Sequence, residues 1–145
     1  MMSQEVRALP EKLSEGCMCG AVRYRISGTP IVAAVCHCDR CRPQSGSAFS
    51  TVIIIKRSTI KLEGETAVFE DIGASGFRVA RRHCPRCGSP LTTEPDAAPE
   101  VMFVKVGGID SNEWFHPVME LFVGKRRPWV ASVTDAQQCE GNPPI

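Results

Sequence analysis

"CPRCGSP" (residues 84–90) is the stretch that decides the fold, because it places two cysteines on either side of a tight turn. Its proline and glycine favour such a turn, and a C-x-x-C turn of this kind is typical of a zinc knuckle. A second pair of cysteines lies in "GCMCG" (16–20), near the start of the chain. Side chains two apart on an extended segment share one face, so we expect both sulfurs of this pair to point the same way. Together the pairs predict a closed structural zinc site, which joins an early strand to a later hairpin and is made by Cys17, Cys19, Cys84 and Cys87.

A third cluster, "CHCDRC", offers only three thiols, those of Cys36, Cys38 and Cys41. Three protein ligands with an open fourth position are the arrangement of catalytic zinc. The cluster could instead be a second structural site completed by His37 or Asp39, and the spacing allows other pairings of the three groups. We therefore expect two Zn²⁺ ions per chain. Cys139 stands alone and is interpreted as a free thiol.

The cellular compartment is predicted from the N-terminal segment. "MMSQEVRALPEKLSEG" (1–16) lacks the apolar core of a secretory signal. No apolar run approaches the roughly 20 residues that span a bilayer, so no membrane association is expected. The protein is therefore expected in the cytoplasm, where thiols stay reduced. Eight cysteines in such a protein favour metal binding over disulfides.

Short apolar or alternating runs recur about every ten residues, with glycine or proline between them. This pattern predicts a mainly antiparallel β-sandwich or open barrel in a single domain over residues 1–145. One or two turns of helix are expected near 39–44, and a loop at "EPDAAPE" (94–100). The expected strands are 21–26, 31–35, 47–55, 59–64, 67–72, 77–84, 101–107 and 118–124.

The overall charge does not indicate a polyanionic partner. Hydrophobic residues make up 43% and charged residues 23%, which are ordinary globular values. The 17 basic and 16 acidic residues leave a net charge of +1, so we expect neither nucleic acid nor an anionic membrane as partner. One group of arginines either balances cysteine charge or forms a solvated face, and we prefer the solvated face. Its members are Arg78, Arg81, Arg82 and Arg86.

Taken together, the motifs resemble one enzyme family. "GCMCGAVRY", "CHCDRCRPQSGSAF", "RRHCPRCGSPL" and "RRPW" occur in the order seen in the glutathione-dependent formaldehyde-activating enzymes, over about residues 16–141. The resemblance implies a mostly antiparallel β-tent stapled by a structural zinc, with little helix. In that family the C-x-C and C-x-x-C cysteines hold the structural zinc and the three-cysteine cluster holds the second. The implied reaction is that of a carbon–sulfur lyase, run in reverse to join glutathione and formaldehyde into S-hydroxymethylglutathione.

Two positions depart from the family pattern. Relatives often have P-x-x-H-I before the late tryptophan, whereas this chain has "PVMEL" (117–121), with Glu120 in place of a frequent histidine. His83 stands where an aromatic residue usually precedes the C-x-x-C pair. The chain is also shorter than the formaldehyde-activating members. The identities of the thiol and the aldehyde are therefore left open, as is the oligomeric state.

The expected mechanism centres on the three-cysteine cluster. A substrate thiol would fill the fourth zinc position, lose its proton and attack an aldehyde carbon. His37 is expected to point away from the sulfurs, either as an acid or base or as a structural hydrogen-bond partner. Arg42 and the "SGSAF" segment (45–49) are expected to meet the substrate, with Arg42 binding a carboxylate. The alternatives are a non-catalytic zinc module that binds a protein and a thiol redox sensor.

Overall fold

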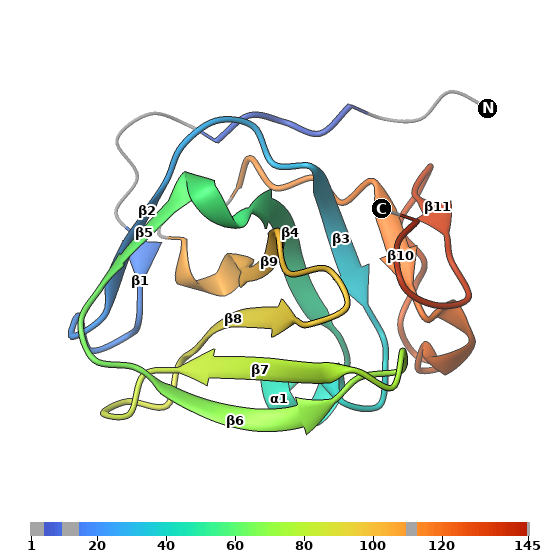
Figure 1. The fold of residues 1–145 in the computed structure, drawn as a ribbon. Coiled ribbons are helices and arrows are strands. Elements are labelled where there is room, and N and C mark those ends of the chain that lie inside the picture. The colour runs from blue at the N-terminus through green and yellow to red at the C-terminus, as the bar shows by residue number, and fades with distance from the viewer. Residues whose placement is uncertain (1–4, 10–14, 110–112, 145) are drawn as a thin grey trace.

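The computed structural model describes residues 5–9, 15–109 and 113–144, and these form two β-sheets with very little helix (Figure 1). The smaller sheet has the order β1-β2-β5, with antiparallel neighbours. Its strands are β1 (Glu15–Gly16), β2 (Arg23–Ile26) and β5 (Ile60–Glu63).

The larger sheet has eight strands in the order β11-β10-β3-β4-β9-β8-β7-β6. Neighbours are antiparallel except that β10 runs parallel to both β3 and β11. The prediction of a mainly antiparallel β fold is thus confirmed. The strands are β3 (Val32–Cys36), β4 (Ser50–Lys56), β6 (Ala67–Ile72), β7 (Arg78–His83), β8 (Pro90–Pro95), β9 (Val101–Lys105), β10 (Met119–Leu121) and β11 (Gln137–Gln138).

Strand β4 is buried on both faces of the larger sheet, because its side chains are apolar on both. Ile53 and Ile55 point into a core shared with the smaller sheet, whereas Val52 and Ile54 point into a second core on the opposite face. All four side chains are at most 2% exposed. Fully burying such a side chain contributes about 1.5–3 kcal/mol, and β-branched residues suit a pleated strand. The second core is the one that adjoins the three-cysteine cluster.

Helix is confined to short segments. The α-helix α1 (Cys41–Ser45) begins at the last cysteine of the three-cysteine cluster, two residues later than the predicted start at 39, and ends one residue later than the predicted end at 44. It ends at Gly46, whose left-handed backbone (φ 67°) glycine adopts without steric cost. The 3₁₀ turns are η1 (Arg57–Thr59), η2 (Val106–Gly108) and η3 (Val123–Lys125). No helix in the described part of the chain is long and apolar enough to cross a membrane.

Strand β8 corrects the sequence prediction. The loop predicted for 94–100 begins inside this strand, which lies between β7 and β9 in the sheet. The polar side chains of β8 resemble those of a loop. Glu94 is nevertheless only 7% exposed, because Arg82 and Arg57 donate hydrogen bonds to its carboxylate. The strand predicted at 67–72 is β6, and that at 31–35 is shifted by one residue in β3. By contrast, the strand predicted at 47–55 begins only at Ser50, and that at 118–124 reduces to β10.

Candidate metal centre

The four-cysteine cluster is built from two turns. Cys17 and Cys19 lie between β1 and β2, and Cys84 and Cys87 lie between β7 and β8. The sulfur of Cys19 is 3.6 Å from that of Cys17 and 3.8 Å from that of Cys84. Sulfurs at about 2.3 Å from a tetrahedral zinc would be roughly 3.8 Å apart. The geometry and the all-thiol donor set therefore fit zinc.

Backbone and hydroxyl donors support these sulfurs. The amide of Val22 donates to Cys17 Sγ at 3.2 Å, and the Ser89 hydroxyl lies 3.2 Å from Cys87 Sγ. Hydrogen bonds from the Ser89 hydroxyl and amide lower the pKa of Cys87 to about 5. The extended C-x-C geometry predicted from sequence is wrong, since residues 17–20 form a turn in which the Gly20 amide donates to the Cys17 carbonyl. The sulfurs still converge, because the turn folds them back toward each other.

The three-cysteine cluster comes from one short segment. Cys36 ends β3, Cys41 begins α1, and Cys38 lies between them, with all three sulfurs within 4.8 Å of one another. The Cys41 amide donates to Cys38 Sγ at 3.2 Å. Hydrogen bonds with Cys36 and Cys41 lower the pKa of Cys38, whereas hydrogen bonds with Cys38 and Cys41, together with burial, raise the pKa of Cys36. Only a bound cation would let all three thiols lose their protons together, so this cluster also fits a metal.

These three sulfurs line a cavity of about 600 Å³. Its apolar wall comes from the second core, with Val52, Phe103, Leu121 and Phe122. Phe122 has a left-handed backbone (φ 54°), an uncommon conformation for a bulky residue and a source of local strain. Three metal donors beside a cavity leave room for one further ligand, whereas the four-cysteine cluster already has a full tetrahedral set.

Lys105 is a residue of this cavity that the sequence analysis missed. It is only 6% exposed, and its Nζ donates to Ser50 Oγ at 2.8 Å. Burial lowers the pKa of Lys105, while the nearby Cys41 opposes that shift. The alternation of side chains along β9 could have revealed Lys105 from sequence. Val101, Phe103 and Lys105 lie on one face of the strand, and Lys105 is the one charged residue on that face.

Arg81 corrects the preferred interpretation of the arginine group. It is 7% exposed and lines the cavity, while Nε donates to Asp71 Oδ2 at 2.8 Å. It therefore does not belong to a solvated face. Arg40 bonds the same carboxylate, and the pKa of Asp71 lies well below its usual range because of hydrogen bonds from Arg40 and Arg81, against the effect of burial. Arg78 does bond the exposed Glu70, as a surface arginine would.

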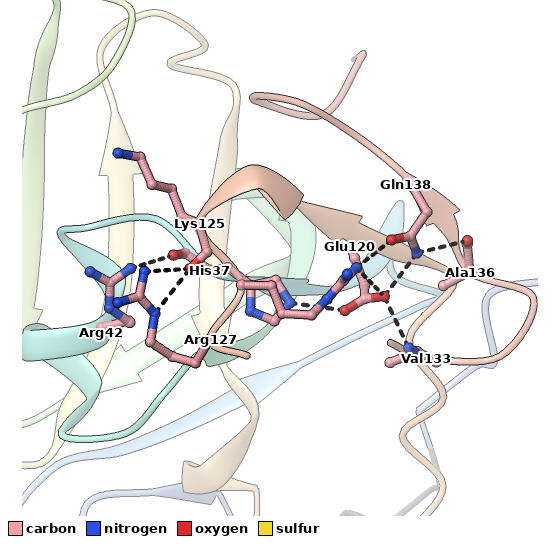
Figure 2. A network of polar contacts seen from close by, with 9 residues as sticks. His37, Arg42, Glu120, Lys125, Arg127, Val133, Ala136 and Gln138 are labelled. Atoms are coloured by element: carbon pink, nitrogen blue, oxygen red, sulfur yellow. Dashed lines mark hydrogen bonds and ion pairs between the residues drawn. The ribbon is translucent and has the colours of Figure 1, made fainter. Parts of the chain in front are cut away.

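His37 points away from the cavity, as strand alternation predicts. It is fully buried, and its Nε2 lies 2.8 Å from Glu120 Oε1 (Figure 2). Glu120 also accepts from Gln138 at 2.8 Å and from the Val133 amide at 2.9 Å. Burial raises the pKa of Glu120, but these hydrogen bonds and Arg126 outweigh it and lower the value. The contact is a structural hydrogen bond, and an acid–base role for His37 stays a prediction.

Arg42 is bonded to neighbouring protein groups and is not at the wall of the cavity where substrate contact was expected. Its guanidinium donates to the His37 carbonyl at 2.8 Å (Figure 2). It also donates to Asp39 Oδ1 at 2.7 Å, and Arg42 does not line the cavity. The "SGSAF" residues face a second cavity of about 730 Å³, to which Ser45, Ser47 and Phe49 contribute. That cavity is larger but contains none of the three clustered sulfurs. Substrate binding by Arg42 stays a prediction.

The remaining lone cysteine lies apart from both clusters. Cys139 is half-buried and packs against the second core. Burial raises the pKa of its thiol. These surroundings agree with a thiol that neither ligates metal nor reacts readily.

Comparison with known proteins supports the fold and the cysteine pattern. A crystal structure of a Rhodobacter sphaeroides protein, a structural-genomics target, is similar with a TM-score of 0.53 and 18% sequence identity, over 68% of this chain and 88% of that one. At that identity the likeness shows the fold alone. No curated protein matches the chain. The family described as glutathione-dependent formaldehyde-activating enzyme matches residues 12–125, which include both cysteine clusters. The chain therefore belongs to the glutathione-dependent formaldehyde-activating enzyme family.

Proposed function

We propose that the protein is a zinc-dependent carbon–sulfur lyase that acts on a thiol–aldehyde adduct resembling S-hydroxymethylglutathione. The observation that carries the proposal is the convergence of Cys36, Cys38 and Cys41 at the wall of a cavity of about 600 Å³. The family match supports an enzyme of this class.

The chemistry is the interconversion of an adduct with its free thiol and aldehyde. The carbon–sulfur bond breaks, its electron pair goes to sulfur, the hydroxyl proton passes to water, and the carbon–oxygen bond becomes double. Zn²⁺ held by Cys36, Cys38 and Cys41 would supply a Lewis acid that stabilises the thiolate at neutral pH.

The residues around the cluster prepare the cavity for this reaction. Val52, Phe103 and Leu121 form an apolar wall, which excludes water and strengthens electrostatic interactions inside. The Lys105 ammonium provides positive charge near the thiolates. The Asp71–Arg40 and Glu120–His37 contacts hold the 36–41 segment that carries the cysteines.

Metal analysis and calorimetry test the proposal together. Protein purified without added zinc should contain two zinc ions per chain, one of which mild chelation removes while the fold survives. Glutathione at millimolar concentration should bind the zinc-loaded protein and not the chelated one. A single tightly held zinc with easily alkylated Cys36, Cys38 and Cys41 would contradict the lyase and favour a redox sensor. Two zinc ions without binding of any small thiol would favour a non-catalytic module.

A further inference from the structure

Two buried cations share the cavity with the three sulfurs, and breaking the carbon–sulfur bond does not require both. Lys105 comes from β9 and Arg81 from β7, and they are 6% and 7% exposed. Removing a charge from water is unfavourable unless the charge finds a partner. Two such groups beside one cavity therefore indicate an anionic partner in that cavity.

Lys105 has donors to spare. An ammonium carries three N–H groups, and its contact with Ser50 Oγ at 2.8 Å occupies one of them. The ion pairs formed among the described residues do not include Lys105. A buried ammonium without a carboxylate partner thus lines the cavity.

Arg81 is only partly paired. Its Nε bonds Asp71, but its Nη1 is buried and has no hydrogen-bond partner within the part of the chain that the structure describes. Thr93 lies opposite Arg81 on β8 and lines the same cavity. Its hydroxyl is also buried and has no hydrogen-bond partner among the described residues. Because Asp71 also serves Arg40, this group keeps one positive charge. A buried donor left without an acceptor is destabilising, so an arriving acceptor would be favoured.

The net charge around the cavity is positive once Zn²⁺ is bound, which favours binding of an anion. Three thiolates and one Zn²⁺ carry one net negative charge, which by itself would repel an anionic ligand. Lys105 and the Arg81–Asp71–Arg40 group each add one positive charge and reverse that sign. The apolar wall keeps water out and strengthens the attraction.

We propose that Lys105, Arg81 and Thr93 bind the carboxylate of the substrate thiol, so that the enzyme selects small thiols that carry a carboxylate. The inference rests on the proposed function, because it places the thiol sulfur at the three-cysteine cluster. If the cations served only to balance the cysteine thiolates, a carboxylate on the ligand would bring no gain in affinity.

The first test varies the ligand and leaves the protein intact. Calorimetry on the zinc-loaded protein compares 3-mercaptopropionate with 3-mercaptopropanol, which has the same thiol and chain length but a hydroxyl instead of the carboxylate. The acid should bind roughly 10-fold to 100-fold more tightly, the usual effect of hydrogen bonds between charged groups. Equal affinity would overturn the carboxylate site and leave the thiol site in place. Absence of binding by both thiols would overturn the proposed function and this inference with it.

The second test varies the protein. Arg81→Gln and Lys105→Met should each remove most of the preference for the acid, and Thr93→Val a smaller part, where the preference is the ratio of the two affinities measured on the same variant. Arg82→Gln is the matched control, since Arg82 lies on the same strand but bonds Glu94 instead of lining the cavity. Thermal unfolding checks that each variant is folded, and Thr93→Val disturbs no ion pair. Full retention of the preference in Arg81→Gln and Lys105→Met would overturn the inference.

Discussion

The two cysteine clusters have the same donor atoms but are held in place by different means. In the first, residues 65 positions apart in the chain bring their sulfurs to 3.8 Å, and the cluster joins the β1–β2 turn to the β7–β8 turn. In the second, all three cysteines lie within one short segment at the end of β3. A metal in the first cluster closes a long loop, whereas a metal in the second closes almost none. The first is therefore suited to stabilising the fold, and the second to binding a ligand.

Protein contacts replace the metal as the support of the second cluster. His37 is held by the buried Glu120, and Arg40 by the buried Asp71. Both contacts reach strands distant in sequence, β10 and β6. The segment can therefore keep its position without metal. The following predictions test this difference, from the largest expected effect to the smallest.

Cys84→Ser should have the largest effect on stability. Structural zinc in small domains binds with about 10–16 kcal/mol, comparable to or greater than the whole stability of roughly 5–15 kcal/mol that a domain has. Urea unfolding followed by circular dichroism should show the variant largely unfolded. Cys139→Ser is the matched control and should change the free energy of unfolding by about 1 kcal/mol or less, since Cys139 belongs to neither cluster. Comparable stability of the two variants would contradict a structural role for the first cluster.

Cys38→Ser should abolish the proposed lyase activity and lower the zinc content by one ion per chain while the fold survives. Cys38 is half-buried, and a metal bound by it would join only residues close in sequence. We therefore expect the free energy of unfolding to fall by only about 1 kcal/mol. Elemental analysis gives the zinc content, and urea unfolding gives the stability. Loss of both zinc ions, or unfolding as extensive as in Cys84→Ser, would show that the two clusters do not differ as described.

Glu120→Gln should weaken the support of the second cluster without touching a sulfur. The buried carboxylate accepts from His37, Gln138 and the Val133 amide, and the amide of glutamine cannot serve all of these donors. Losing hydrogen bonds to a buried charge typically costs about 2 kcal/mol. Urea unfolding measures this loss, and zinc affinity of the second site should fall with it. Glu70→Gln, in the exposed pair with Arg78, is the control and should lie within about 0.5 kcal/mol of the unaltered protein. An equally small effect of Glu120→Gln would argue against the support.

The sequence revealed the metal ligands better than the cavity around them. Cysteine spacing is local information, so both clusters could be predicted, as could the outward direction of His37; the strands β3 and β7 that lead into the clusters were predicted as well. The two buried charged residues of the cavity come from β7 and β9, and the face that each presents depends on pairing across the sheet. The sequence therefore predicts a solvated Arg81 and does not single out Lys105. Strand β8 was missed because Glu94 is buried with partners distant in sequence, Arg57 and Arg82, that no local pattern reveals.

Asp71→Asn should change how stability depends on acid, and this is the smallest of the effects. Arg40 and Arg81 hold the pKa of Asp71 below the value of about 3.9 expected in the unfolded chain. Its contribution to stability is therefore present above about pH 4 and is lost as the pH falls through the lower folded value. The urea midpoint of the unaltered protein should drop more steeply from pH 5 to pH 3 than that of the variant. Acid releases zinc from both proteins alike, so the difference between the two curves isolates the carboxylate. Parallel curves would mean that the ion pairs of Asp71 do not hold the second cluster's segment in solution, and metal would then have to position it.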